Sequence, residues 1–297
     1  MSRDNKNLLA LIPLLLQLFS KKPSSLLALL LLGCSWFGYQ TLSVHPRPDM
    51  SFKGLPQTQS ATNTNTWNRT LSNQAFLVGY SDKRGNPLWV TYALQKVPEN
   101  ANRLKRPGQF KADRRAVNKV SPHDYDKSGY DRGHLAPNYA ISALYGKEAQ
   151  LETFVMTNIS PQKPNLNRKI WQRLEQAEID YFTRLSPHVW VTTGPVFDEQ
   201  IETLKTAKNV EIPDAFYKVY AIANGKNDIA LLAFLIPQTV NGNEPLDRYV
   251  VSVDTIEQLT GLDFFHELED KQENALESAL NVTPWKLEQL SQIKSRY

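Results

Sequence analysis

The segment DRGHLAP, residues 131–137, carries more structural information than any other stretch of this 297-residue chain. It is followed by NISPQ at residues 158–162 and by NLNR at residues 165–168. Alternate side chains of an extended segment share a face, so Arg132 and His134 are expected to point to the same side. Downstream, apolar residues between positions 167 and 184 predict a helix that begins at Asn167.

These side chains match the needs of phosphodiester hydrolysis: a base that activates water, cations that neutralise the phosphate oxygens, and help for the leaving alkoxide. His134 is the candidate base, and Arg132 is a candidate cation. A lone histidine is more often structural than catalytic, but the neighbouring arginine favours a catalytic role here. The other histidines lack such neighbours, at positions 45, 123, 188 and 266.

Asn167 and Glu175 are candidates for a metal site on the predicted helix. The amide oxygen of Asn167 suits Mg²⁺, which takes few protein ligands and keeps most of its waters. Glu175 follows eight residues later, about two helical turns on, and could hold the ion through a water molecule. The structural alternatives are a helix N-cap for Asn167 and a surface pair with Arg173 for Glu175.

Strands and helices interspersed along the chain predict an α+β fold with a mainly antiparallel sheet flanked by helices. Residues 76–80 and 88–94 are expected to form a hairpin across a turn at 82–87, and residues 215–221 are expected to pair with 229–236. Further strands are predicted at 154–157 and at 189–193, the latter ended by Gly194-Pro195. Asp254 is expected to cap a helix that starts at Thr255.

Residues 1–44 are predicted to be a signal or membrane-anchor region. No charged residue occurs from Pro23 to Val44, about the length that crosses a bilayer, and the preceding pair Lys21-Lys22 predicts that the rest of the chain is translocated. We expect an exported protein: membrane-anchored, periplasmic or extracellular. A lipoprotein acylated at Cys34 ranks second, and cleavage of the segment stays open.

The rest of the chain divides into a polar, poorly ordered linker at residues 45–75, a domain at 76–270, and a helical tail at 271–297. Cys34 is the single cysteine, so the folded part has neither a disulfide nor a cysteine-based zinc site. The net charge of +4 is mild, but residues 103–119 contain seven basic side chains against Asp113. This run is either a track for a phosphate backbone or a solvated loop.

The DRGH segment and the spaced set Asn158, Gln162, Asn167, Trp171 and Glu175 resemble the DNA/RNA non-specific endonuclease family. TGPVF at 193–197 and TGLDFF at 260–265 are also similar to family segments, so the resemblance covers roughly residues 76–265.

The resemblance implies a ββα-metal site in which His134 is the general base and Asn167 binds one Mg²⁺, with Mn²⁺ as a substitute. It further implies that Glu175 acts beside the metal, that Arg132 stabilises the phosphorane-like charge, and that products carry 5′-phosphates. DNA, RNA or both would be the substrate.

The family also has an upstream arginine that faces the phosphate. Arg106 is the best match, with Arg103, Arg114 and Arg115 as alternatives. Asp131 is expected to brace its loop, and Asn158 to be a structural hydrogen-bonding residue.

Two other interpretations compete with the nuclease. One is a catalytically weak nucleic-acid-binding module of the same fold, and the other is a membrane-anchored structural protein in which the motif is accidental. A homodimer is left open.

Overall fold

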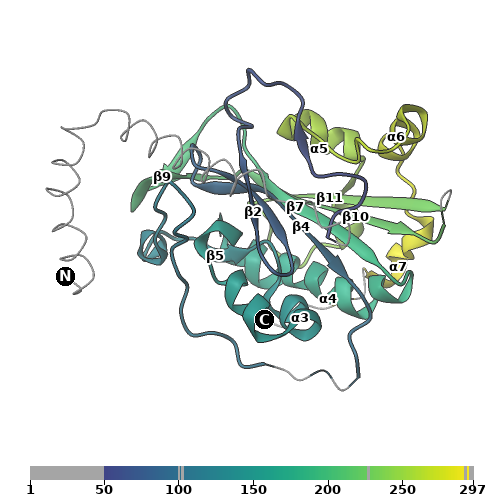
Figure 1. Ribbon diagram of the computed structural model, residues 1–297, viewed down its shortest axis with the longest axis horizontal. Coiled ribbons are helices and arrows are strands. Elements are labelled where there is room, and N and C mark those ends of the chain that lie inside the picture. The colour runs from purple at the N-terminus through teal and green to yellow at the C-terminus, as the bar shows by residue number, and fades with distance from the viewer. Residues whose placement is uncertain (1–49, 100, 102–103, 226–227, 291–292, 294–297) are drawn as a thin grey trace, which may run out of the picture. The chain divides into compact units, whose positions relative to one another are not determined.

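A seven-stranded antiparallel sheet forms the centre of the computed structural model, which describes residues 50–99, 101, 104–225, 228–290 and 293 (Figure 1). The strand order is β12-β11-β10-β7-β4-β3-β2. In sequence order the strands are β2 (Arg69–Ser72), β3 (Leu77–Ser81), β4 (Asn86–Leu94), β7 (Val189–Val196), β10 (Ala215–Ala223), β11 (Ile229–Pro237) and β12 (Val250–Val251). The expected α+β fold is confirmed, including the β3–β4 hairpin and the β10–β11 pair.

Smaller elements surround this sheet. Three two-stranded ribbons pair β1 (Gln57–Thr58) with β13 (Leu262–Asp263), β5 (Asp131–His134) with β6 (Ile159–Gln162), and β8 (Glu202–Leu204) with β9 (Ala207–Ile212). The helices are α3 (Asn138–Thr153), a π-helical segment (Leu166–Trp171), α4 (Gln172–Asp180), α5 (Val253–Thr260), α6 (Asp270–Glu277) and α7 (Leu287–Leu290). Short 3-10 turns occupy Pro122–Tyr125, Met156–Asn158, Phe182–Arg184, Leu246–Tyr249 and Thr283–Trp285.

Helices cover both faces of the sheet, which explains why its central strands are almost continuously apolar. α3 and α4 lie on one side, and α5 and α6 lie on the other (Figure 1). The alternation along β10 shows the division: Phe216 packs edge-on against Trp171 beside α4, whereas its neighbour Tyr217 packs against Phe264 beyond α5. Every residue of β4 is buried, as expected for a strand covered on both faces.

A buried charge pair fastens α4 to the sheet. Lys218 of β10 forms an ion pair with Glu178 of α4, and both side chains are fully buried. The hydroxyls of Tyr92 and Tyr220 donate to the same carboxylate at 3.2 and 3.0 Å. Removing one partner of a buried pair leaves an uncompensated charge, so this contact holds α4 in one position.

The prediction of a strand at residues 154–157 is wrong. This segment turns as a 3-10 helix at Met156–Asn158, and the strand β6 begins only at Ile159. The buried amide of Asn158 accepts from the N–H of Ala136 and donates to the carbonyls of Ala136 and Thr153. Such side-chain bonds to the backbone compete with a strand ladder.

Two predicted element ends also differ. Ser252, not Asp254, caps α5: its Oγ accepts from the N–H of Thr255 at 3.2 Å, and Asp254 lies in the first turn. β7 continues through Gly194 to Val196. A Cβ at Gly194 would lie 2.1 Å from the carbonyl oxygen of Leu88. That glycine lets two strands approach closely and does not end the strand.

The segment expected as a poorly ordered linker, residues 45–75, is structured where it is described. β2 pairs with β3 and β1 pairs with β13. Met50 is buried, and its carbonyl accepts from the hydroxyl of Thr91 at 2.9 Å. Backbone hydrogen bonds hold this segment, so it needs few apolar side chains and its composition carried no strand signal.

At the other end, the expected tail at 271–297 contributes to the same core. The indole of Trp285 is buried against Phe182, with ring centroids 5.0 Å apart, and its Nε1 donates to the carbonyl of Leu231.

The predicted signal or anchor region at residues 1–44, including Cys34, lies outside the described residues. In the part that is described, no helix has the length and apolar character to cross a bilayer.

Candidate active site

The β5–β6 ribbon presents His134 to a pocket that is also lined by residues of α3 and α4. Asp131 pairs with Gln162, Gly133 with Ser160, and His134 with Ile159. A Cβ on Gly133 would lie 2.2 Å from Oε1 of the buried Gln162, so any larger residue between Arg132 and His134 would have to displace that side chain or the strand. Trp171 fixes the end of the ribbon from the helix side, where its Nε1 donates to the carbonyl of His134 at 3.2 Å.

His134 packs against two aromatic rings and is only 7% exposed. The ring centroids of Phe110 and Phe154 are 5.4 and 4.8 Å from the imidazole centroid. Burial, followed by the positive charge of Arg106, lowers the pKa of His134 to about 3. Among the described residues, Nε2 of His134 has no hydrogen-bond partner. The imidazole is therefore neutral at physiological pH and keeps an unused nitrogen.

Asn167 faces this ribbon from the π-helical segment and is held by Asp131. Its Nδ2 donates to Oδ2 of Asp131 at 2.9 Å, while Arg168 binds both oxygens of the same carboxylate at 2.8 and 2.6 Å. Because a carboxylate can only accept, this bond identifies the nitrogen end of the amide and leaves the oxygen as the free acceptor. Asp131 thus acts as a side-chain brace for Asn167, and Asn167 lies inside the helix, not at its N-cap.

Arg132 is held away from His134. Its Nε and Nη2 donate to the carbonyl of Pro122 at 3.0 and 2.6 Å, and its guanidinium forms an ion pair with Asp126. Hydrogen bonds from His123 and then Arg132 lower the pKa of Asp126. Arg132 still borders the pocket, but its charge is paired with that of Asp126 in the free protein.

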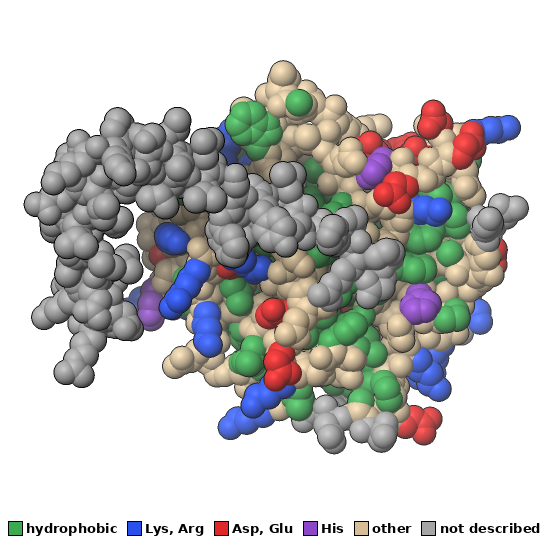
Figure 2. All heavy atoms as spheres, viewed as in Figure 1, with side chains coloured by type: hydrophobic (Ala, Val, Ile, Leu, Met, Phe, Trp, Pro, Cys, Tyr) green, Lys and Arg blue, Asp and Glu red, His purple; other side chains and the backbone are tan. Residues whose placement is uncertain are grey.

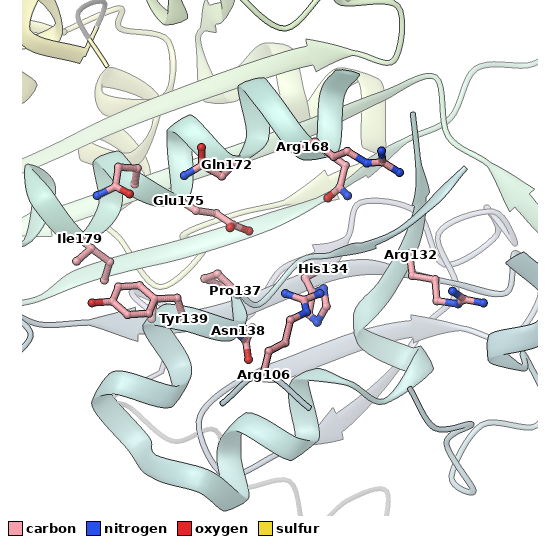
Figure 3. A pocket seen from close by; sticks show the side chains of 13 residues that line it. Arg106, Arg132, His134, Pro137, Asn138, Tyr139, Arg168, Gln172, Glu175 and Ile179 are labelled. Atoms are coloured by element: carbon pink, nitrogen blue, oxygen red, sulfur yellow. The ribbon is translucent and has the colours of Figure 1, made fainter. Parts of the chain in front are cut away.

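The pocket has a volume of about 570 Å³ and gathers all five predicted site residues: Arg106, Arg132, His134, Asn167 and Glu175. Glu175 extends from the helix, while His134 and Arg106 lie together on the opposite side (Figure 3). In the same view Arg132 points outward. Three arginines line the pocket, Arg106, Arg132 and Arg168, and their positive charge suits a polyanionic ligand.

Sequence reasoning missed part of this pocket. α3, which was not predicted, supplies Asn138 and Tyr139 at the floor, and Gln150 orients Asn138 by donating to its Oδ1 at 2.9 Å. The polar residues that open α3 carry no motif, so nothing in the pattern marked them. Gln172 and Ile179 complete the helix side.

The basic run divides between an arginine that lines the pocket and one that is structural. Arg106 lines the pocket, and its guanidinium lies 5.0 Å from the ring centroid of Phe154. Arg115 instead pairs with Asp113 and donates to the carbonyl of Ser72. Arg103 lies outside the described residues, and Arg114 is not among the pocket residues.

A strand histidine that faces a helix-borne amide and carboxylate across a pocket lined by arginines is the arrangement that the resemblance to the class of ββα-metal nucleases predicted.

Comparison with known proteins identifies the family within that class. The family model for DNA/RNA non-specific endonuclease matches residues 55–271, and the chain belongs to this family. It is 29% identical over 205 residues to mitochondrial endonuclease G of Homo sapiens, covering 65% of this chain and 68% of that protein. A nuclease of Nostoc sp. is 26% identical over 276 residues, which cover 86% of this chain and 96% of the relative.

The fold is also similar to a solved crystal structure of the EndoG/EndoGI complex. The match has a TM-score of 0.58 and 25% identity, and it covers 68% of this chain and 88% of that one. The chain is thus a nuclease of the hydrolase class, as the sequence predicted.

Proposed function

We propose that this protein is a metal-dependent endonuclease that hydrolyses phosphodiester bonds of DNA, RNA or both with little sequence preference. His134 removes a proton from the attacking water, and the 3′ oxygen leaves, so products carry 5′-phosphates. The observation that carries the proposal is the neutral, unpartnered Nε2 of His134 inside a pocket lined by arginines.

The low pKa of the free histidine fits this role once substrate is bound. Burial and Arg106 hold the pKa of His134 down to about 3 in the free protein. A phosphodiester beside both groups carries negative charge, which counteracts Arg106 and acts to raise the pKa of the imidazole. The histidine therefore gains basicity when its substrate is in place.

The donor set of the pocket fits one Mg²⁺, with Mn²⁺ as a substitute. The amide oxygen of Asn167 would bind the ion directly, and the carboxylate of Glu175 would act beside it; both are the hard oxygen donors that these ions prefer. When bound, the cation neutralises charge on the phosphate and stabilises the leaving oxygen. Asp131 and Arg168 keep the amide oriented for this contact.

The arginines bind and orient the substrate. Arg106 lies beside His134, so a phosphate that contacts its guanidinium also lies near Nε2. Arg132 reaches the phosphate if its ion pair with Asp126 breaks and its guanidinium contacts the substrate instead. Export, with anchoring through residues 1–44, is our proposal for localisation, on the sequence pattern alone.

The test is plasmid and RNA degradation by the full chain. We expect supercoiled DNA, RNA or both to be cleaved with Mg²⁺ and not with EDTA, and the ends to be ligatable without added phosphate. His134→Ala should lower turnover by at least about 100-fold while DNA binding persists. His188→Ala, which changes an exposed histidine far along the sequence, is the matched control.

Full turnover in His134→Ala would refute the base assignment. Nucleic-acid binding with no cleavage under Mg²⁺ or Mn²⁺ would instead favour the binding module.

A further inference from the structure

A second group of carboxylates lies on the other side of the sheet, between α5 and α6. It consists of Asp254 and Glu257 of α5 and Glu277, the last residue of α6. One oxygen from each side chain lies within 4.8 Å of the others. Acidic side chains are visible where these two helices meet the surface (Figure 2). None of these residues lines the active-site pocket.

Glu277 is the unusual member, because it is buried without a partner. Only 4% of the residue is exposed, and its Oε1 has no hydrogen-bond partner among the described residues. An ionised carboxylate is costly to bury unless a cation or donors compensate it. Its position aggravates the cost, since the C-terminal end of a helix carries partial negative charge.

The surroundings add more negative charge. Asp263 and Glu273 act on the same carboxylates, and His266 faces Glu273. Burial, followed by neighbouring carboxylates, raises the pKa of Glu277 to about 9 and that of Glu257 to about 7. A group of acids arranged in this way is stable only with bound protons or with a bound cation.

We propose that Asp254, Glu257 and Glu277 form a site for a hard divalent cation of the Ca²⁺ type, which clamps α6 onto α5. Carboxylate oxygens are the ligands that such ions prefer, and Ca²⁺ accepts an irregular shell completed by water. Glu257 is already oriented, because its Oε1 accepts from the N–H of Phe264 at 2.7 Å. Glu277 lies beyond residue 271, where the family match ends, so the matched family segment does not contain the whole site.

The proposal predicts opposite effects of one substitution with and without metal. We would measure thermal unfolding of the full chain at pH 8 in EDTA and in millimolar CaCl₂. Ca²⁺ should raise the Tm of the unmodified protein by at least about 3 °C, because it binds only the folded state. Glu277→Gln should unfold at the same or a higher temperature in EDTA, because it removes a carboxyl group that is costly to bury, and should lose the Ca²⁺ response.

Two control variants and one replacement variant make the result decisive. Glu267→Gln, which changes a nearby exposed carboxylate, should keep the full Ca²⁺ response. Asn167→Ala should keep it as well, which separates this site from the catalytic pocket. Asp254→Asn, at the half-exposed edge of the group, should lose it and replaces Glu277→Gln if that variant does not fold.

Titration calorimetry on the Asn167→Ala protein should find one Ca²⁺ per chain. The proposal is overturned if the unmodified protein shows no Ca²⁺ response, if Glu277→Gln and Asp254→Asn retain it, or if Asn167→Ala abolishes it. In the first case protons hold the carboxylates together. In the last case the ion belongs to the catalytic pocket.

Discussion

His134 shows how burial sets the chemistry of a single residue. Two aromatic rings and a guanidinium surround the imidazole, so its pKa lies at about 3, well below its ordinary value of 6.5. A group with a depressed pKa stays unprotonated in the folded state while the unfolded chain takes up a proton. The neutral His134 therefore makes its full contribution to the free energy of unfolding above pH 6.5. That contribution is lost as the pH falls from 6.5 toward 3.

The difference between the pKa of His134 in the folded and in the unfolded protein predicts how stability changes with pH through this side chain. Between about pH 6 and pH 4, urea unfolding of the full chain should lose up to about 1.4 kcal/mol per pH unit through His134. The slope for His134→Gln, which does not titrate, should be shallower by that amount. His188→Gln should keep the original slope, and equal slopes in all three proteins would show that His134 is solvated.

The π-helical segment Leu166–Trp171 sets the relation between Asn167 and Glu175. Eight residues make about 2.2 turns of an α-helix, which would place Glu175 about 80° around the axis from Asn167. A π-helix closes i→i+5 bonds and takes more residues per turn. The segment therefore reduces this offset and brings the amide and the carboxylate toward one face.

Gly133 has the corresponding role in the β5–β6 ribbon, and we predict that Gly133→Ala lowers kcat by at least about tenfold. The added methyl group meets the buried side chain of Gln162, so Gln162 or β5 must shift, and a shift of β5 carries His134 with it. Small displacements of a catalytic group are costly in rate. Steady-state plasmid cleavage measures the loss.

The double variant Gly133→Ala/Gln162→Ala should recover part of that activity, because it removes the side chain that the methyl group meets. No recovery would mean that the alanine acts through something other than this contact.

The elements that the sequence predicted well are those whose apolar runs report burial directly. β3, β4, β10 and β11 were placed within a few residues, because a strand covered on both faces is apolar throughout. β2 was missed because backbone bonds at a sheet edge leave no apolar pattern. For the site, the motifs identified which residues approach one another. They could not show that Asp131 braces Asn167 or that Asp126 holds Arg132, since both contacts depend on tertiary packing.

At the scale of the molecule, the position of positive charge matters more than its net value of +4. Arg106 faces the pocket. Arg115 instead forms an ion pair with Asp113 and donates a hydrogen bond to a backbone carbonyl. DNA affinity, measured in the His134→Ala background between about 50 and 200 mM KCl, should fall with salt. Arg106→Ala should reduce the log–log slope by about one, as expected for one lost phosphate contact.

Arg115→Ala is the matched control for this measurement. It should leave the salt slope unchanged and lower the Tm instead, because it removes contacts to Asp113 and Ser72. A smaller slope in Arg115→Ala than in Arg106→Ala would reverse the assignment of the two arginines.

Trp285 has a practical consequence for anyone who shortens this protein. The family match ends at residue 271, which would be a natural C-terminal boundary for an expressed fragment. The indole of Trp285 covers Phe182 and Tyr220, and its nitrogen caps a carbonyl of β11. A recombinant fragment that ends at residue 271 would expose those rings to solvent as a hydrophobic surface and would be prone to aggregate. Useful expression boundaries therefore follow the packing of the C-terminal turn, not the limits of sequence similarity.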